Sequence, residues 1–257
     1  RVTATLGNWI KLGGANAIGV TTANHCSFSA NWTNSHDPAC YHGLAFMPIE
    51  LFFGLAILLC SVVIHEVAHG YVAEWLGDPT ARLAGRLTLN PLRHLDWFGS
   101  VLLPLMFLAF SPGFIFGWAK PVPYNPHNLR AGRAGPALVA VAGPAANLLL
   151  AIIFGLAFRF GIITTLGLDA ATPLFAHIVL VNLMLAVFNL MPVPPLDGSR
   201  ILVALLPYRY YWLERWLESY GLIFILVLLL VGSPLITQLV WFLSNLIVGP
   251  ALLMLQM

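Results

Sequence analysis

Long apolar segments restrict the fold of this chain more than any other feature of its sequence. Several stretches are long and apolar enough to cross or enter a hydrocarbon core about 30 Å thick, which takes roughly 20 helical residues per crossing. Only 9% of the 257 residues are charged, whereas soluble domains have about 25%. Such segments must pair their backbone polar groups internally, as a helix does. The sequence therefore predicts an all-α polytopic membrane protein with about five to six transmembrane helices.

Apolar and polar stretches divide the chain further. Helices are expected at residues 49–76, 136–160, 173–190, 219–231 and 234–255. Residues 98–118 are apolar but interrupted by prolines, and residues 82–89 alternate weakly between polar and apolar side chains. The second pattern predicts a short membrane-associated β-hairpin.

The domain organisation follows from the same pattern. Residues 1–46 are polar and lack the apolar stretch of a signal peptide, so they are expected to be a leader that is appended or disordered. Residues 47–257 are expected to form one membrane domain, with a core at 49–206 and accessory helices at 219–257. No soluble domain is evident in the sequence.

Two histidines lie one helical turn apart in the run His65-Glu66-Val67-Ala68-His69. Their imidazoles project from the same face of the expected helix and can share one tetrahedral metal, with Glu66 beside them as a base for bound water. Ionisable groups inside a transmembrane helix are costly and are therefore functional candidates. The alternative is a pair of polar groups satisfied within a helix bundle. The spacing favours a zinc site that performs hydrolysis.

A catalytic zinc usually has three protein ligands and one open position for water. Glu74 lies on the same helix but points about 180° away from His65, so it is not expected to bind the metal. Asp197 is the better candidate, because it follows a proline-rich break after an apolar helix and Gly198 permits a tight turn there. The alternative role for Asp197 is to cap the following helix.

Three motifs in this order resemble those of the site-2 protease family of intramembrane metalloproteases, peptidase family M50. They are His65-Glu66-Val67-Ala68-His69, Gly143-Pro144-Ala145-Ala146-Asn147 and Leu196-Asp197-Gly198. The similarity covers approximately residues 49–206. Residues 117–123 also resemble the compact bacterial branch of the family, which has neither a PDZ nor a CBS domain. The polar leader and the segment at 98–118 depart from the family pattern.

The resemblance implies a set of roles for individual residues. One Zn²⁺ per chain would be bound by His65, His69 and Asp197. Glu66 would take a proton from the metal-bound water and return it to the leaving amine. Asn189 resembles the family asparagine ahead of the Leu-Asp-Gly motif and is the expected donor to the oxyanion, while Asn147 would contact substrate or support the ligands. For each asparagine, a hydrogen bond between helices is the alternative.

The activity implied by the resemblance is hydrolysis of peptide bonds in or near transmembrane segments, as in regulated intramembrane proteolysis. The expected partners are single-span membrane proteins as substrates and the lipid bilayer. A formal charge of +2 gives no argument for nucleic acid. The main alternative is a non-proteolytic membrane protein that binds or transports zinc with the same ligands.

Membrane topology follows from the site itself, because its two halves must meet at the same depth. His65 lies late in its helix and Asp197 follows the third expected helix, so an odd number of crossings must separate the two. One helix between them supplies that crossing, which makes residues 98–118 a re-entrant or interfacial segment rather than a full span. With this layout the basic residues beyond residue 80 share one face, except for Arg159. By the positive-inside rule that face is cytoplasmic, so the active site is expected to lie toward the cytoplasm. The resemblance to the bacterial branch of the family implies that the membrane is a bacterial inner membrane.

Overall fold

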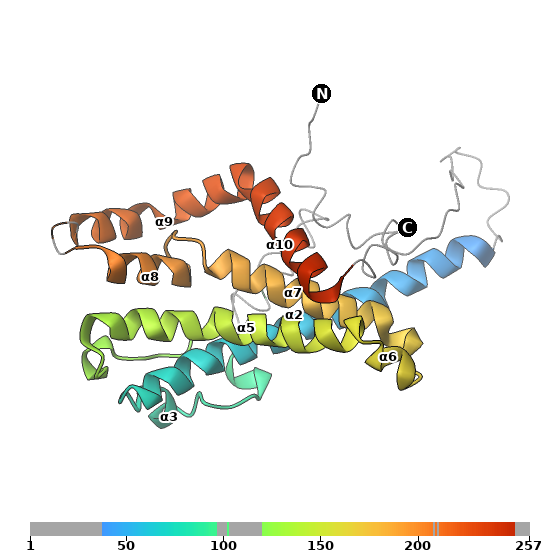
Figure 1. Ribbon diagram of the computed structural model, residues 1–257, viewed down its shortest axis with the longest axis horizontal. Coiled ribbons are helices and arrows are strands. Elements are labelled where there is room, and N and C mark those ends of the chain that lie inside the picture. The colour runs from blue at the N-terminus through green and yellow to red at the C-terminus, as the bar shows by residue number, and fades with distance from the viewer. Residues whose placement is uncertain (1–37, 97–101, 103–119, 208, 210, 250–257) are drawn as a thin grey trace.

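The computed structural model describes residues 38–96, 102, 120–207, 209 and 211–249, and Figure 1 shows their arrangement. Its helices are α2 (Pro38–Trp75), α3 (Thr80–Leu83), α5 (Gly135–Arg159), α6 (Ile162–Thr165), α7 (Thr172–Asn189), α8 (Asp197–Leu205), α9 (Tyr211–Val231) and α10 (Ser233–Val248). Single 3-10 turns lie at Pro91–Arg93, Pro126–Asn128, Gly132–Ala134 and Asp169–Ala171. Within the described residues, no segment forms a β-strand.

Three of the described helices are long and apolar enough to cross a membrane. They span Phe52–Trp75, Gly132–Arg159 and Asp169–Asn189. Helices α9 and α10 meet at an angle of 67° and add a fourth crossing only if the bent pair is counted as one span. The prediction of a helical membrane protein is therefore confirmed, whereas the predicted count of five to six crossings is not.

Prolines mark the starts of the helices that the sequence located best. Pro136 and Pro173 occupy the first turns of α5 and α7, where the missing N–H of proline has no helical partner to lose. Both helices begin and end within one residue of the expected positions. Helix α2 is longer than expected, because it begins at Pro38 and continues through the boundary expected at residue 47. The rest of the expected leader, residues 1–37, lies outside the described residues.

The core is a bundle of α2, α5 and α7, with α10 packed against α5 and α7. Figure 1 shows that α2 and α7 run in the same direction and that α5 runs in the opposite direction. This alternation agrees with the parity expected from the positions of His65 and Asp197. The buried apolar centre consists of Ala151, Val179, Leu183, Val187, Ile236, Val240 and Val248.

One polar contact ties two of the spans together inside the bundle. The side-chain amide of Asn182 in α7 donates to the hydroxyl of Ser61 in α2 at 3.0 Å, and also to the carbonyl of Ile178 in its own helix. Both Asn182 and Ser61 are buried. Such hydrogen bonds hold membrane helices together where apolar burial gives no preference for protein over lipid.

The hairpin predicted for residues 82–89 is not confirmed. Arg82 belongs to α3, and the residues after it form turns without a strand partner. The reason lies upstream, because the Asp78 carboxylate accepts hydrogen bonds from both the backbone N–H and the hydroxyl of Thr80 and so starts a helical turn. Arg86 then donates its backbone N–H to the carbonyl of Ala81. The expected re-entrant segment at 98–118 lies outside the described residues, apart from Leu102.

Candidate metal centre

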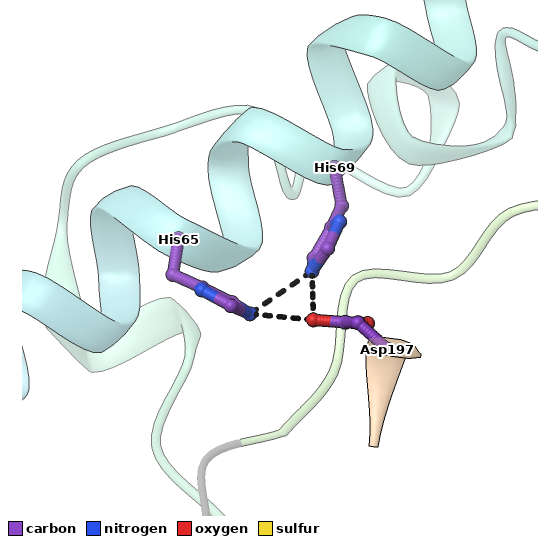
Figure 2. Close-up of side chains that lie close together, drawn as sticks. All are labelled: His65, His69 and Asp197. Carbon is purple, nitrogen blue, oxygen red and sulfur yellow. Dashed lines mark hydrogen bonds and ion pairs between the residues drawn. The ribbon is translucent and has the colours of Figure 1, made fainter. Parts of the chain in front are cut away.

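Two imidazoles and one carboxylate converge beside the second half of α2 (Figure 2). The Nε2 atoms of His65 and His69 lie 3.0 Å apart. The Oδ2 atom of Asp197 lies 3.1 Å from Nε2 of His65 and 3.3 Å from Nε2 of His69. All three candidate ligand atoms lie within 4.8 Å of one another. The structure therefore brings together residues that are 132 positions apart in the sequence.

The protonation pattern of these groups suits a cation. Nδ1 of His69 lies 2.7 Å from the carbonyl oxygen of Val139 in α5. A carbonyl can only accept, so Nδ1 is the protonated nitrogen and Nε2 of the neutral ring is left with a lone pair. That lone pair faces a carboxylate oxygen and a second imidazole in a buried position. A zinc ion satisfies this donor set, because imidazole nitrogen and carboxylate oxygen are both common zinc ligands.

Gly143 of α5 makes room for the two imidazoles. A Cβ atom at this position would lie 2.5 Å from Nε2 of His69 and 2.6 Å from both Cε1 and Nε2 of His65. Ordinary van der Waals contact with a Cβ begins at about 3.4 Å. The glycine of the middle motif therefore lets α5 lie directly against the candidate ligands.

Asp197 is the first residue of α8, a helix that the sequence did not predict. The preceding residue, Leu196, is extended, and Gly198 fits against the backbone of Leu190 so closely that a side chain has no space. Arg133 donates to the carbonyls of Val203 and Leu206 at the other end of α8. Asp197 is therefore not the cap of α8, because Leu196 occupies that position and no side chain there accepts a capping hydrogen bond. Its carboxylate lies against the histidines instead.

Glu66 is held by a loop rather than by its own helix. Its Oε2 atom accepts a hydrogen bond from the backbone N–H of Val122 at 2.9 Å. This contact could not be predicted, because a backbone donor has no sequence signature. Glu74 forms a surface pair with Arg82, consistent with its rejection as a ligand.

The two asparagines differ in their surroundings. Asn147 is fully buried one turn after Gly143, and neither its Nδ2 nor its Oδ1 has a hydrogen-bond partner in the part of the chain that the structure describes. Asn189 is half-buried and donates from Nδ2 to the carbonyl of Leu185 in its own helix at 2.9 Å. A buried amide without partners is costly. Among the described residues, Asn147 therefore stands out as a buried side chain with an unused donor and an unused acceptor one helical turn from Gly143.

His94 lies in the segment after α3, and its side chain is fully buried. Nε2 of His94 lies 2.8 Å from the carbonyl oxygen of Thr88, and the carbonyl of His94 accepts from the N–H of Lys120 at 2.8 Å. His94 therefore joins the segment after α3 to the loop that contacts Glu66.

Comparison with known proteins gives consistent matches. The family model described as Peptidase family M50 matches residues 162–232, which include Asp197. The chain is 39% identical over 210 residues to YwhC of Bacillus subtilis, provisionally named a zinc metalloprotease, covering 80% of this chain and 90% of that protein. It is 34% identical over 198 residues to Rip2 of Mycobacterium tuberculosis, which has the same provisional name, covering 75% and 70% respectively.

A third relative is more distant. The zinc metalloprotease MJ0392 of Methanocaldococcus jannaschii is 28% identical over 194 residues, which cover 74% of this chain and 46% of that protein. No solved structure matches the chain.

Proposed function

The chain belongs to peptidase family M50 and is a zinc metalloprotease, and we propose that it hydrolyses peptide bonds in or near transmembrane segments of other membrane proteins. This activity is that of regulated intramembrane proteolysis. The observation that carries the proposal is that three candidate ligand atoms converge, two of them from a long apolar helix. Ionisable groups within a membrane span are costly, so a metal site at this position is expected to serve a function in the membrane.

The proposed ligands are His65, His69 and Asp197. When bound, zinc supplies a Lewis acid and an acidified water at this position. Glu66 takes a proton from the attacking water and returns it to the leaving amine. The N–H of Val122 fixes one oxygen of Glu66, which leaves the other oxygen for proton transfer.

Asn147 and Asn189 are the proposed donors to the oxyanion of the tetrahedral intermediate. A donor that is already in place contributes most, because no reorganisation is needed at the moment of reaction. Asn147 is buried and its amide has no partner among the described residues, whereas Asn189 must first release the carbonyl of Leu185. These surroundings favour Asn147 over Asn189 as the first donor to the oxyanion.

The proposed location is a bacterial inner membrane with the active site toward the cytoplasm. Helices α2 and α7 end on the same side of the bundle, and the loops there are rich in arginine (Figure 1). Arg159 ends α5 on the opposite side. Basic loops remain on the cytoplasmic side during insertion. The proposed partners are the lipid bilayer and single-span membrane proteins as substrates.

The decisive experiment reconstitutes the full chain into liposomes with a library of single-span proteins and identifies fragments by mass spectrometry. We expect Glu66→Gln to keep its zinc and to lose cleavage by at least about 100-fold, the contribution typical of a general base. Glu74→Gln is the matched control, because Glu74 lies on the same helix but pairs with Arg82 at the surface. It is expected to cleave like the native chain.

The same preparation separates the proposal from its alternative. A zinc-binding or transport protein needs the ligands but no general base. Zinc transport into the liposomes that is unchanged by Glu66→Gln, together with the absence of fragments from the native chain, would refute the protease proposal.

A further inference from the structure

The loop of residues 120–128 rests on the face of α2 that carries the candidate base. Val122 is buried, and its backbone N–H donates to Oε2 of Glu66 at 2.9 Å. Its side chain packs over Gly70, one turn further along α2, where a Cβ would lie 2.9 Å from Cγ1 of Val122. The loop therefore contacts α2 at two successive turns.

The composition of the loop makes this donor specific. Pro121 and Pro123 flank Val122 and have no backbone N–H. The amide of Val122 is thus the only backbone donor within these three residues. Prolines also restrict the backbone on both sides, so the position of the donor depends on where the ends of the loop are fastened.

Asp78 fastens one end of this loop to the end of α2. Its buried carboxylate accepts hydrogen bonds from two directions. Oδ1 accepts from the backbone N–H and hydroxyl of Thr80 and from the side chain of Asn128, the last at 2.8 Å. Oδ2 accepts from the backbone N–H of Asn125 at 2.6 Å, three residues after Val122.

The charge of Asp78 is stabilised by these donors. Burial by itself raises the pKa of the Asp78 carboxyl, but the hydrogen bonds from Thr80, Asn128 and Asn125 outweigh burial and hold the pKa below its usual range. A second fastening lies nearby, where the N–H of Arg130 donates to the carbonyl of Leu76 at 2.8 Å. The loop therefore has a fixed register on α2.

We propose that Asp78 is a positioning residue for Glu66, which it orients by holding the loop that presents the N–H of Val122. The inference rests on the proposed function, because it concerns the orientation of that base. Asp78 itself lies beyond the end of α2 and belongs to none of the three motifs. Small displacements matter, since a shift of about 1 Å in a positioned group can reduce the rate about 100-fold.

Asp78→Asn is expected to break the hydrogen bond to Asn125 and to keep those to Thr80 and Asn128. The asparagine oxygen can still accept from Thr80 and Asn128 where Oδ1 lies, but its NH₂ group then faces the N–H of Asn125, where Oδ2 accepted. Thr80→Val is the matched control, because it removes a donor on the other side of the carboxylate and leaves the loop attached.

Two measurements on the full chain in lipid nanodiscs test the proposal. In the cleavage assay, Asp78→Asn is expected to lower kcat at least about 10-fold with unchanged KM and zinc content, whereas Thr80→Val keeps the native kcat. In hydrogen exchange, a peptic peptide of residues 119–123 reports the Val122 amide alone, because its first two residues lose their label and the prolines carry none. Exchange of this amide is expected to accelerate at least about 10-fold in Asp78→Asn and in Glu66→Ala, but not in Thr80→Val.

The outcomes separate the two proposals. Native cleavage with a normal kcat in Asp78→Asn would refute the positioning role and leave the proposed function standing. A rise in kcat would also refute it, because the loop would then hold Glu66 away from its working position. If the native chain cleaves nothing, the proposed function fails and the positioning role fails with it, while the exchange result still decides whether Asp78 holds the loop on Glu66.

Discussion

Gly143→Ala is expected to damage the metal centre directly by adding one methyl group to α5. The new Cβ would lie 2.5 Å from Nε2 of His69 and 2.6 Å from Nε2 of His65. The closer of these contacts is about 0.9 Å shorter than the 3.4 Å at which ordinary contact begins. Ligand distances in a zinc site tolerate only about 0.2 Å. The imidazoles must therefore move out of bonding range, or α5 must move away from α2.

The magnitude follows from the cost of overpacking. Inserting a methyl into a well-packed site typically costs about 1–3 kcal/mol. If this free energy is lost from zinc binding by the two imidazoles, zinc affinity falls about 5- to 150-fold. Cleavage should fall with zinc occupancy and recover in part at high zinc concentration.

The assay is a chelator competition on purified protein, with bound zinc measured by mass spectrometry. Gly155→Ala is the matched control, because Gly155 also lies on α5 and its new Cβ would contact the side chain of Ile247 comparably closely, away from the candidate ligands. That control is expected to lower thermal stability but to keep zinc affinity within about twofold. Native zinc affinity in Gly143→Ala would refute the argument that α5 lies directly on the two imidazoles.

Two further predictions concern stability. A double-mutant cycle of Ser61→Ala and Asn182→Ala is expected to give a coupling free energy of about 0.6 kcal/mol, and at most about 1.7 kcal/mol. The measurement is a reversible unfolding assay in mixed micelles. Additive effects of the two substitutions would contradict the contact between α2 and α7. The stability that the Asp78 carboxylate contributes is fully present above the unfolded pKa of about 3.9 and is lost as the pH falls through the lower folded value. The difference in melting temperature between the native chain and Asp78→Asn should thus be constant from pH 7 to about 5 and shrink only below about 4, and a difference that disappears near pH 6 would contradict it.

The sequence predicted the helices whose limits are set locally. Helices α5 and α7 begin at prolines and continue through long apolar runs, so their positions depend little on the rest of the fold. Helix α8 was not expected, because its nine residues contain Gly198 and Ser199 and follow a proline-rich break. It is stabilised from outside by Arg133, which no local pattern could show.

The features near the site that the sequence did not predict have the same origin. Weak alternation suggested a hairpin at residues 82–89, but the side chain of Asp78 starts a helical turn there. The burial of His94 likewise depends on contacts within a folded segment, where its ring donates to the carbonyl of Thr88. The pairing of His65 and His69 was predictable because the spacing of histidines on a helix is a local property. Asp197 also lies beside them, as expected from its motif, although it is 132 residues away in the sequence. The support of Glu66 depends on tertiary contacts of a loop and lay beyond prediction.

The origin of the candidate ligands has a mechanical consequence. Two come from the span Phe52–Trp75 and one from the segment that follows the span Asp169–Asn189, so a bound ion would act as a cross-link between parts of the chain 132 residues apart. Closing so long a loop constrains the open forms of the bundle far more than the closed form. A bound metal would then hold α8 and α2 together as well as take part in catalysis. Its removal would leave α8 and the end of α7 free to separate from α2.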